Sequence, residues 1–470
     1  MRKVLAVLLG LLAGLSFCSR AGTLSRPNIL FIIADQWRAQ SFGYAGDPNV
    51  KTPNLDRLER ESVDFSQAVS RIPVCSPTRA SLLTGQRPLT HGVFINDVPL
   101  NPNLPTLATV LGKAGYDTGC IGKWHVDGHG RSAFIPRERR MGFEYWKVLE
   151  CTHNYNHSDY YGDAPGKQQW EGYDAIDQTR DAQRYLQAHA GTRRPFLLWM
   201  AWGPPHNPYE TAPPRYLALY PPEKIRLPAN IPADARDVAR RELAGYYAHC
   251  TALDDCIGDL ITSLKTNALL KNTIIVFTSD HGDMLHAHNQ QRKQRPYEES
   301  IRVPMLLRLP EVLGVKPGKV AGTINTEDVL PTLLGLCGVP SPNSVQGHDF
   351  TGYLRGKADP SGGEASIECI SPFGEFTRGQ GGREYRGLRT TRYTYVQDLH
   401  GPWLLFDNLR DPLQQTNLVG IIAQQALKSK LEKRLKSRLA AEHDAFLTGP
   451  EYLAKWNYRV DATGTMSYTP

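Results

Sequence analysis

The chain has 470 residues, of which 41% are hydrophobic and 21% are charged, and its formal net charge is +7. This is the composition of a globular protein that can bury a large core. The positive charge is mild and no run of lysine and arginine resembles a nucleic-acid arm, so we expect no nucleic-acid partner, whereas an anionic substrate is compatible with it.

The start of the chain resembles a secretory leader. Arg2 and Lys3 precede an apolar run over residues 4–17, and small and polar residues follow. A run of about fourteen mostly apolar residues is short for a membrane span. We therefore expect residues 1–22 to be a signal peptide, the protein to be exported to the periplasm or the medium, and no stable membrane span. The bulky phenylalanine before Cys18 disfavours a lipoprotein.

Four short apolar runs without alternation predict strands that are covered on both faces, as in a parallel sheet. In chain order they are residues 28–34, 116–122, 196–202 and 273–279. Helical patterns lie between or beside them at residues 106–114, 174–190 and 238–265. This alternation predicts an α/β fold with a doubly wound, mostly parallel sheet flanked by helices.

A segment from Cys75 to Gly85 predicts a turn that leads into a helix, because Pro77 suits a first helical turn and Gly85 a stop. Cys75 would then lie at the helix N-terminus, where unpaired N–H groups and the dipole favour an anion. An ordinary core cysteine is the alternative interpretation. None of the eight cysteines forms a Cys-x-x-Cys pair, so neither a zinc ribbon nor a redox pair is expected. Six of them could include disulfides, at positions 120, 151, 250, 256, 337 and 369.

Polar side chains follow each predicted strand. In chain order they are Asp35 and Gln36, Lys123 and His125, His206, and Asp280 and His281. Open α/β sheets bind ligands outside the carboxyl ends of their strands, so we expect these groups at one rim. The oxygen-rich set that follows the first and fourth strands suits a hard cation such as Ca²⁺ or Mg²⁺, and the histidine leaves room for Mn²⁺.

The character of the sequence changes at about residue 360. Residues 360–363 are typical of a linker, residues 386–396 alternate like a hairpin, and residues 421–446 predict a basic amphipathic helix. We interpret the basic face of that helix as a solvated outer face rather than a membrane surface. The expected organisation is a large α/β domain at 27–358 and a smaller α+β subdomain at 365–470.

Several ordered motifs resemble those of the type I sulfatases of the alkaline-phosphatase-like superfamily. They are residues 28–36, 52–58, 75–79, 122–125, 279–283 and 297–304. The resemblance extends from about residue 27 to residue 412, which is nearly the whole mature chain. It implies an alkaline-phosphatase-like fold and hydrolysis of a sulfate ester.

The resemblance also implies a mechanism. Cys75 would be oxidised to 3-oxoalanine (formylglycine) by a formylglycine-generating enzyme, and one hydroxyl of its hydrate, held by the metal and Arg79, would attack sulfur. The second hydroxyl would then let the aldehyde re-form and release sulfate. By similarity, His125 would deprotonate the hemiacetal, Lys123 and Lys293 would hold sulfate oxygens, and His206 or Lys293 would assist the leaving oxygen. The implied metal ligands are Asp35, Gln36, Cys75, Asp280 and His281.

Two positions depart from the commonest family pattern, which has aspartate in place of Gln36 and asparagine in place of His281. Both departures occur in members that resemble choline sulfatases and phosphonate monoester hydrolases, so a phosphonate or phosphate monoester hydrolase is one alternative. Residues 122–125 favour a true sulfatase instead. An inactive protein that binds sulfated glycans is a second alternative, against which the complete set of site residues argues. Export and the basic surface suggest a sulfated carbohydrate. Residues 150–157 are interpreted either as a substrate loop or as an ordinary surface loop.

Overall fold

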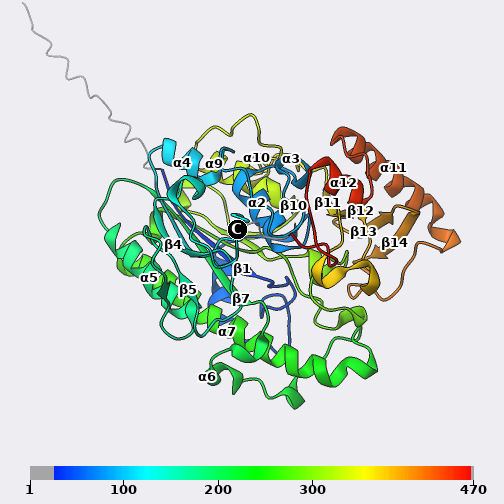
Figure 1. Ribbon diagram of the computed structural model, residues 1–470, viewed down its shortest axis with the longest axis horizontal. Coiled ribbons are helices and arrows are strands. Elements are labelled where there is room, and N and C mark those ends of the chain that lie inside the picture. The colour runs from blue at the N-terminus through cyan, green and yellow to red at the C-terminus, as the bar shows by residue number, and fades with distance from the viewer. Residues whose placement is uncertain (1–25, 467–470) are drawn as a thin grey trace, which may run out of the picture.

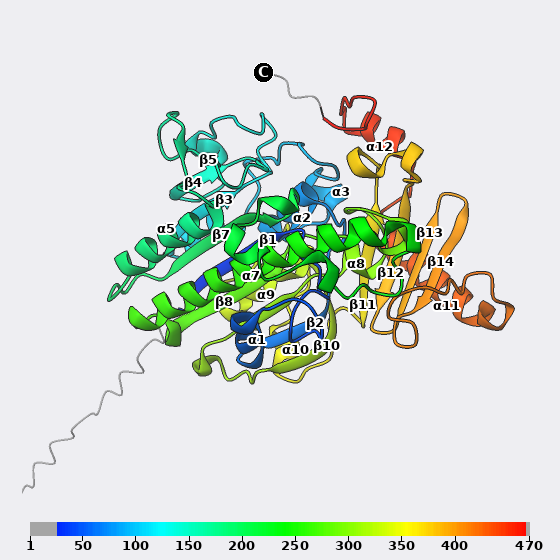
Figure 2. The same cartoon turned by 90° about the horizontal axis from the view of Figure 1, so that it is seen from below.

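A computed structural model describes residues 26–466 of the protein. A large sheet lies between two layers of helices, and a second, smaller sheet lies beside it (Figures 1 and 2). The expected signal peptide lies outside the described residues. Within residues 26–466, no helix has both the length and the apolar character that a membrane crossing requires.

The large sheet has eight strands, and the four strands predicted from the sequence are neighbours at its centre. Their order is β8, β1, β7 and β3, all parallel. Only β9 among the eight is antiparallel to its neighbours, so the prediction of a mostly parallel sheet is confirmed. The full order is β10 (Gly318–Asn325), β2 (Val63–Val69), β9 (Met305–Arg308), β8 (Thr273–Ser279), β1 (Asn28–Asp35), β7 (Phe196–Pro205), β3 (Asp117–Lys123) and β4 (Tyr145–Leu149).

The central strand β1 shows why its sequence is apolar without alternation. Ile29, Phe31 and Ile33 belong to the core on one face of the sheet, whereas Leu30 and Ile32 belong to the core on the other. Helices cover both faces, so every side chain of the strand is buried. One layer contains α2 (Cys75–Thr84), α4 (Leu107–Lys113) and α9 (Val329–Leu336), and the other contains α1 (Pro53–Arg60), α5 (Asp174–Ala188) and α7 (Arg236–Thr266).

The second sheet is an antiparallel meander in which consecutive strands pair. Its strands are β11 (Glu364–Cys369), β12 (Tyr385–Thr390), β13 (Tyr393–Asp398) and β14 (Gly401–Asp407). The predicted hairpin is therefore confirmed as β12 and β13. Helix α11 (Gln425–Ala441) packs Leu431 and Leu435 on this sheet and is shorter than the predicted span of 421–446. The division into two domains at about residue 360 stays a prediction.

Short elements complete the described chain. They are α3 (Pro88–His91), β5 (Asp159–Tyr160), β6 (Gln168–Gln169), α6 (Pro214–Leu217), α8 (Glu298–Ile301), α10 (Thr351–Leu354) and α12 (Gly449–Lys455). The seven cysteines within residues 26–466 are all free and buried, so the six that could have formed disulfides form none in this structure. Cys250 and Cys256 both lie in α7, and Cys75 and Cys151 line a cavity, whereas Cys120, Cys337 and Cys369 pack elsewhere in the core as small apolar residues.

Candidate active site

The carboxyl ends of the central strands bring the predicted polar residues together. Asp35 ends β1, Lys123 ends β3, His206 follows β7 and Asp280 follows β8. All four side chains are buried. The strands are parallel and in adjacent positions of the sheet, so their ends meet at one rim, as the sequence predicts.

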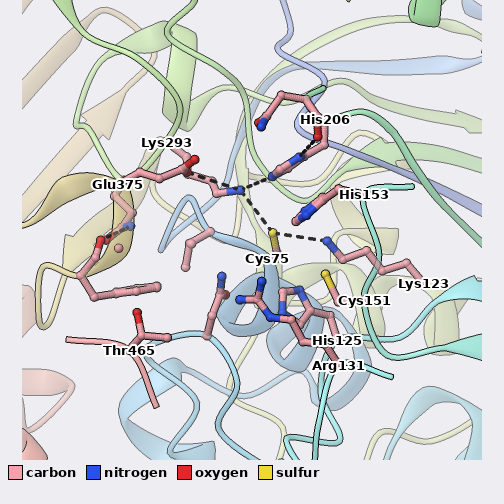
Figure 3. A pocket seen from close by; sticks show the side chains of 16 residues that line it. Cys75, Lys123, His125, Arg131, Cys151, His153, His206, Lys293, Glu375 and Thr465 are labelled. Atoms are coloured by element: carbon pink, nitrogen blue, oxygen red, sulfur yellow. Dashed lines mark hydrogen bonds and ion pairs between the residues drawn. The ribbon is translucent and has the colours of Figure 1, made fainter. Parts of the chain in front are cut away.

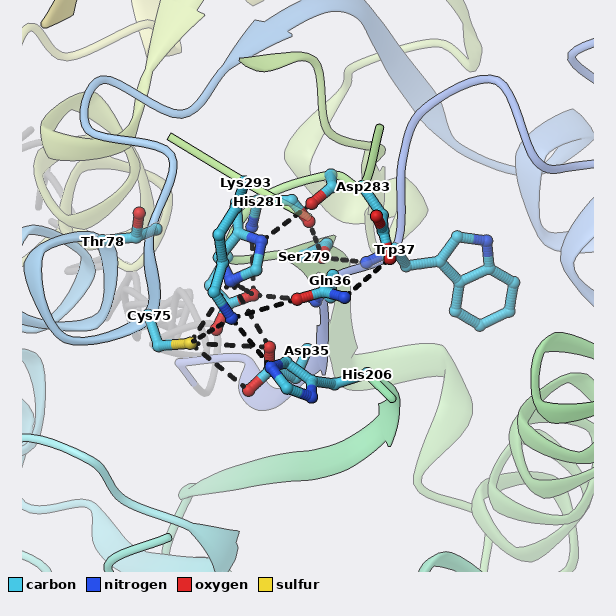
Figure 4. A network of polar contacts seen from close by, with 12 residues as sticks. Asp35, Gln36, Trp37, Cys75, Thr78, His206, Ser279, His281, Asp283 and Lys293 are labelled. Carbon is cyan, nitrogen blue, oxygen red and sulfur yellow. Dashed lines mark hydrogen bonds and ion pairs between the residues drawn. The ribbon is translucent and has the colours of Figure 1, made fainter. Parts of the chain in front are cut away.

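Cys75 lies at the N-terminus of α2, and Asp35, His281 and Lys293 surround its sulfur (Figure 4). The Sγ atom lies 3.3 Å from His281 Nε2, 3.6 Å from Lys293 Nζ and 3.8 Å from Lys123 Nζ. The helix ends at Gly85, which has a left-handed conformation with φ of 64°. The helix predicted around Cys75 is therefore confirmed, and the cysteine faces a set of cations rather than an apolar core.

Four donor groups converge closely enough to hold a metal ion. One ligand atom from each of Asp35, Cys75, Asp280 and His281 lies within 4.8 Å of the others, and all four residues are buried. His281 Nδ1 donates to the Gly282 carbonyl at 2.9 Å, which leaves the lone pair of Nε2 directed at the cluster. Two carboxylates and a neutral imidazole suit a divalent cation, so the residues present fit the expected metal.

Arg79 lies one helical turn after Cys75 and bridges the two carboxylates. Its Nε donates to Asp280 Oδ2 at 3.0 Å, and Nη2 donates to Asp35 Oδ2 at 3.5 Å. Burial alone would raise the pKa of Asp35, but the charges of Lys123, His206, Arg79 and His281 together outweigh this and hold that pKa well below its usual value. Burial and the charge of Asp35 raise the pKa of Asp280. The two carboxyl groups thus repel each other, and a cation between them would relieve that repulsion.

Gln36, an expected metal ligand, lies beside the cluster with its amide already engaged. Its Oε1 accepts from Lys293 Nζ at 3.0 Å, and its Nε2 donates to Asp283 Oδ2 at 2.6 Å. These contacts orient Lys293 toward Cys75. In this structure the side-chain oxygen of Gln36 therefore contacts the ammonium group of Lys293.

Lys293 and His206 form a hydrogen-bonded pair at the cavity wall (Figure 3). Lys293 Nζ lies 2.8 Å from His206 Nε2, and His206 Nδ1 lies 2.8 Å from the Asn207 carbonyl. Burial and the charge of Lys293 lower the pKa of His206, so its neutral ring accepts from the ammonium group. The His153 ring stacks on His206 with centroids 4.5 Å apart.

The end of β3 and the loop after it hold Lys123 and His125, and their path depends on Gly122. This glycine has φ of 102°, and a Cβ there would lie 2.1 Å from the Ala201 carbonyl oxygen, so no side chain fits. Lys123 forms an ion pair with Asp35. His125 Nε2 lies 3.1 Å from Asp97 Oδ1, while its buried Nδ1 has no hydrogen-bond partner within residues 26–466.

Asp97 was missed by sequence reasoning. It also accepts from Arg131 Nη2 at 2.8 Å, and it has a left-handed φ of 65°. Because its carboxylate can only accept, it fixes the proton of His125 on Nε2. Burial would lower the pKa of His125, but the charge of Cys151 and the hydrogen bond to Asp97 raise it to about 10. No motif in the sequence marks Asp97.

A cavity of about 210 Å³ opens over Cys75. The expected substrate loop contributes Cys151 and His153 to its wall. Part of the wall comes from segments that sequence reasoning left unassigned. These are Asn96, Arg131, Phe373, Gly374, Glu375 and Thr465.

Comparisons with known proteins bear on this site. The sequence matches the Sulfatase family over residues 27–339 and the family described as N-sulphoglucosamine sulphohydrolase, C-terminal, over residues 287–441. It is 43% identical to an ulvan-active sulfatase of Formosa agariphila, over 92% of this chain and 85% of that protein. It is 29% identical to an endo-4-O-sulfatase of Bacteroides thetaiotaomicron, over 83% and 88% of the two chains. The solved structure of a Bacteroides fragilis protein described as the sulfatase yidJ is similar, with a TM-score of 0.82, 31% identity and coverage of 91% and 98%.

Proposed function

Because the chain belongs to the sulfatase family and is therefore a sulfuric ester hydrolase, we propose that its cavity removes sulfate from a sulfated carbohydrate. The observation that carries this proposal is the position of Cys75. Its Sγ lies within 4 Å of two lysine ammonium groups and beside three further donors that could hold a metal. The substrate class is supported by the names of two relatives, which act on ulvan and as an endo-4-O-sulfatase.

Two groups that are added to the chain complete this proposal. A formylglycine-generating enzyme converts Cys75 to formylglycine, whose hydrate supplies the nucleophilic hydroxyl. Asp35, Asp280 and His281 hold a divalent cation, Ca²⁺ in first place with Mg²⁺ or Mn²⁺ as alternatives, which supplies positive charge at the sulfate. Gln36 would bind the metal only after its side-chain oxygen gives up the hydrogen bond from Lys293.

The remaining residues of the site would bind sulfate or transfer protons. Lys123 and Lys293 approach Cys75 from two sides and would hold sulfate oxygens. Arg79 keeps the two buried carboxylates in place. The ammonium group of Lys293, hydrogen-bonded to His206, would donate a proton to the leaving alcohol. His125 would take the hemiacetal proton on Nδ1, because Asp97 occupies its other nitrogen; with a pKa of about 10, the ring acts as a base only in its deprotonated form.

The leader supports a proposal about location. Arg2, Lys3 and the apolar run that follows suit export to the periplasm or the medium, where a sulfated polymer would be met. Fusion of residues 1–22 to a reporter enzyme that is active only outside the cytoplasm tests this. A reporter that stays inactive would contradict export.

The activity is tested on one preparation whose residue 75 has been characterised by mass spectrometry. We expect hydrolysis of 4-nitrophenyl sulfate and release of sulfate from at least one sulfated polysaccharide. Cys75→Ala should abolish both, whereas Cys120→Ala, which changes a buried cysteine of β3 outside the cavity, should retain them. Removal of the metal with a chelator should stop turnover, and addition of Ca²⁺, Mg²⁺ or Mn²⁺ should restore it.

Two outcomes would contradict the proposal. A larger kcat/KM for a phosphonate monoester than for the matching sulfate ester would favour a phosphonate hydrolase on the same scaffold. Fully modified protein that binds sulfated glycans without releasing sulfate would favour a binding protein. An unmodified thiol at position 75 would instead account for inactivity and calls for repetition with the generating enzyme co-expressed.

A further inference from the structure

A second cavity lies away from the candidate active site, between α11 and the start of the second sheet. Its volume is about 700 Å³. One wall is α11, which runs along the outer edge of the molecule (Figures 1 and 2). The opposite wall is formed by Pro360, Ser361, Gly362 and Glu364. His348 and Arg87, which lies just beyond the C-terminal end of α2, also line the cavity. We call this cavity the α11 groove.

The sequence of α11 separates into three faces. Leu431 and Leu435 recur four residues apart and pack on the second sheet. Lys428 and Lys436, on another face, do not line the groove. The groove face contains residues at three- and four-residue spacings, which lie along one side of a helix. They are Lys430, Lys433, Arg434, Ser437, Arg438 and Ala441.

Positive charge predominates in the α11 groove. Five cationic side chains line it, from Arg87, Lys430, Lys433, Arg434 and Arg438, against the two carboxylates of Glu364 and Glu442.

Carboxylates hold the arginines but not the lysines. Arg438 lies 3.3 Å from Glu364 and 3.8 Å from Glu442, and Arg87 lies 3.5 Å from Glu442. Lys430 and Lys433 are exposed, and neither forms an ion pair with any residue from 26 to 466.

We propose that the α11 groove binds a sulfated polysaccharide at a site separate from the catalytic cavity. This inference rests on the proposed function, because a polymer substrate gives the groove its ligand. Fixed arginines beside two free lysines match an anionic chain that carries repeated sulfate groups. A membrane surface fits less well, because the lining contains no large apolar side chain that could enter a bilayer.

The position of the groove defines what binding there would do. Helix α2 has ten residues, about 15 Å of helix, and carries Cys75 at one end and Arg87 just beyond the other. A chain in the groove therefore does not occupy the catalytic cavity. It would keep other segments of the same polymer close to the enzyme, which raises their effective concentration at the active site. KM for the polymer should then depend on the groove, and kcat should not.

The test uses dextran sulfate as the probe, in native gels with increasing polymer concentration. One variant carries Lys430→Gln with Lys433→Gln. The matched control carries Lys428→Gln with Lys436→Gln, which removes the same charge from the same helix on another face. We expect the groove variant to bind dextran sulfate roughly tenfold more weakly than the control. Both should hydrolyse 4-nitrophenyl sulfate like the unchanged protein.

Each contrary outcome has a definite meaning. Equal weakening of both variants, or no retardation of the unchanged protein, would overturn the proposal. So would groove-dependent binding to phosphatidylserine vesicles without groove-dependent retardation by dextran sulfate, because a membrane would then be the partner. Retardation needs no turnover, so inactivity toward every sulfate ester would count against the proposed function and leave the result for the groove intact.

Discussion

The cavity at Cys75 and the α11 groove both gather positive side chains, but they hold them differently. Lys123 and Arg79 are buried, and each contacts a buried carboxylate. Lys430 and Lys433 are exposed and have no such partner within residues 26–466. A buried charge must be paired and is thereby fixed in position, whereas an exposed charge stays mobile and is screened by salt. The first arrangement suits chemistry at one sulfur atom, and the second suits reversible binding of a polyanion.

The largest effect should come from the buried metal cluster. Asp280→Asn removes one of its two carboxylates while keeping the shape of the side chain. We expect kcat/KM for 4-nitrophenyl sulfate to fall by at least about 10³-fold, with loss of bound metal by elemental analysis. Asp163→Asn, which changes an exposed aspartate paired with Arg140, is the control and should retain activity and metal. Full metal content in Asp280→Asn would show that this carboxylate is not a ligand.

Removal of one buried cation comes next. Lys123→Ala should lower kcat/KM for a sulfate ester by about 10²- to 10³-fold, since the ammonium group contacts both Asp35 and Cys75. Lys147→Ala is the control on the neighbouring strand β4, where the lysine pairs with Asp181 at the edge of the sheet. Similar losses in the two variants would indicate that the sheet, rather than the sulfate site, had been disturbed.

A buried ion pair outside the cavity tests whether a buried charge contributes to the stability of the fold. Arg389 donates to both carboxylate oxygens of Glu298, at 3.0 and 2.9 Å. Glu298→Gln should lower the free energy of unfolding by about 3–5 kcal/mol, because Arg389 would remain buried without its counter-charge. Urea unfolding measures this, with the exposed Glu138→Gln as the control. A change in the free energy of unfolding below about 1 kcal/mol would contradict the distinction between buried and exposed charges.

The same pair predicts a pH dependence with a definite sign. Burial would raise the pKa of Glu298, but the charges and hydrogen bonds of Arg389 and Arg302 together lower it below its usual value. The unfolded chain therefore binds more protons at acid pH. The stabilisation is fully present above the usual glutamate pKa and is lost as the pH falls through the folded value. Unfolding measured at neutral and acid pH should thus show a smaller deficit of Glu298→Gln in acid.

A smaller effect is expected at Asp97, which acts through His125. Asp97→Asn keeps the left-handed backbone accessible but no longer requires Nε2 of His125 to carry the proton. We expect kcat to fall by about 10- to 100-fold with little change in KM, and the pH profile to shift because the imidazole loses its carboxylate. A loss confined to KM, or an unchanged pH profile, would mean that Asp97 only supports the fold.

The smallest effect belongs to the surface. Arg137 and Glu144 form an ion pair in which the side chains are 73% and 63% exposed. Arg137→Ala should change the free energy of unfolding by no more than about 0.5 kcal/mol, because water and salt screen the pair. Chemical denaturation at low and high salt measures this. A loss of more than about 1 kcal/mol in the free energy of unfolding would show that exposed charges can matter for stability as buried charges do.

Local signals explain which parts of the site could be predicted. Cys75 and Gly85 bracket a helix by rules that act within a few residues, and Asp35 follows an unbroken apolar strand. Asp97 contacts His125, and Thr465 reaches the cavity, only through tertiary packing between segments that are separated in the chain. The α11 groove could not be predicted for another reason. Helical periodicity places its lysines on one face of the helix but does not show which segment packs opposite that face.

The cavity wall has one more consequence, because it is assembled from two sources. The strand ends supply the groups around sulfur, whereas Phe373, Glu375 and Thr465 come from the last quarter of the sequence. Mutations in that last quarter could therefore change which sulfate ester is accepted while the groups around sulfur stay the same. Exchange of the C-terminal segment between relatives, in evolution or in the laboratory, should therefore change the substrate without changing the reaction.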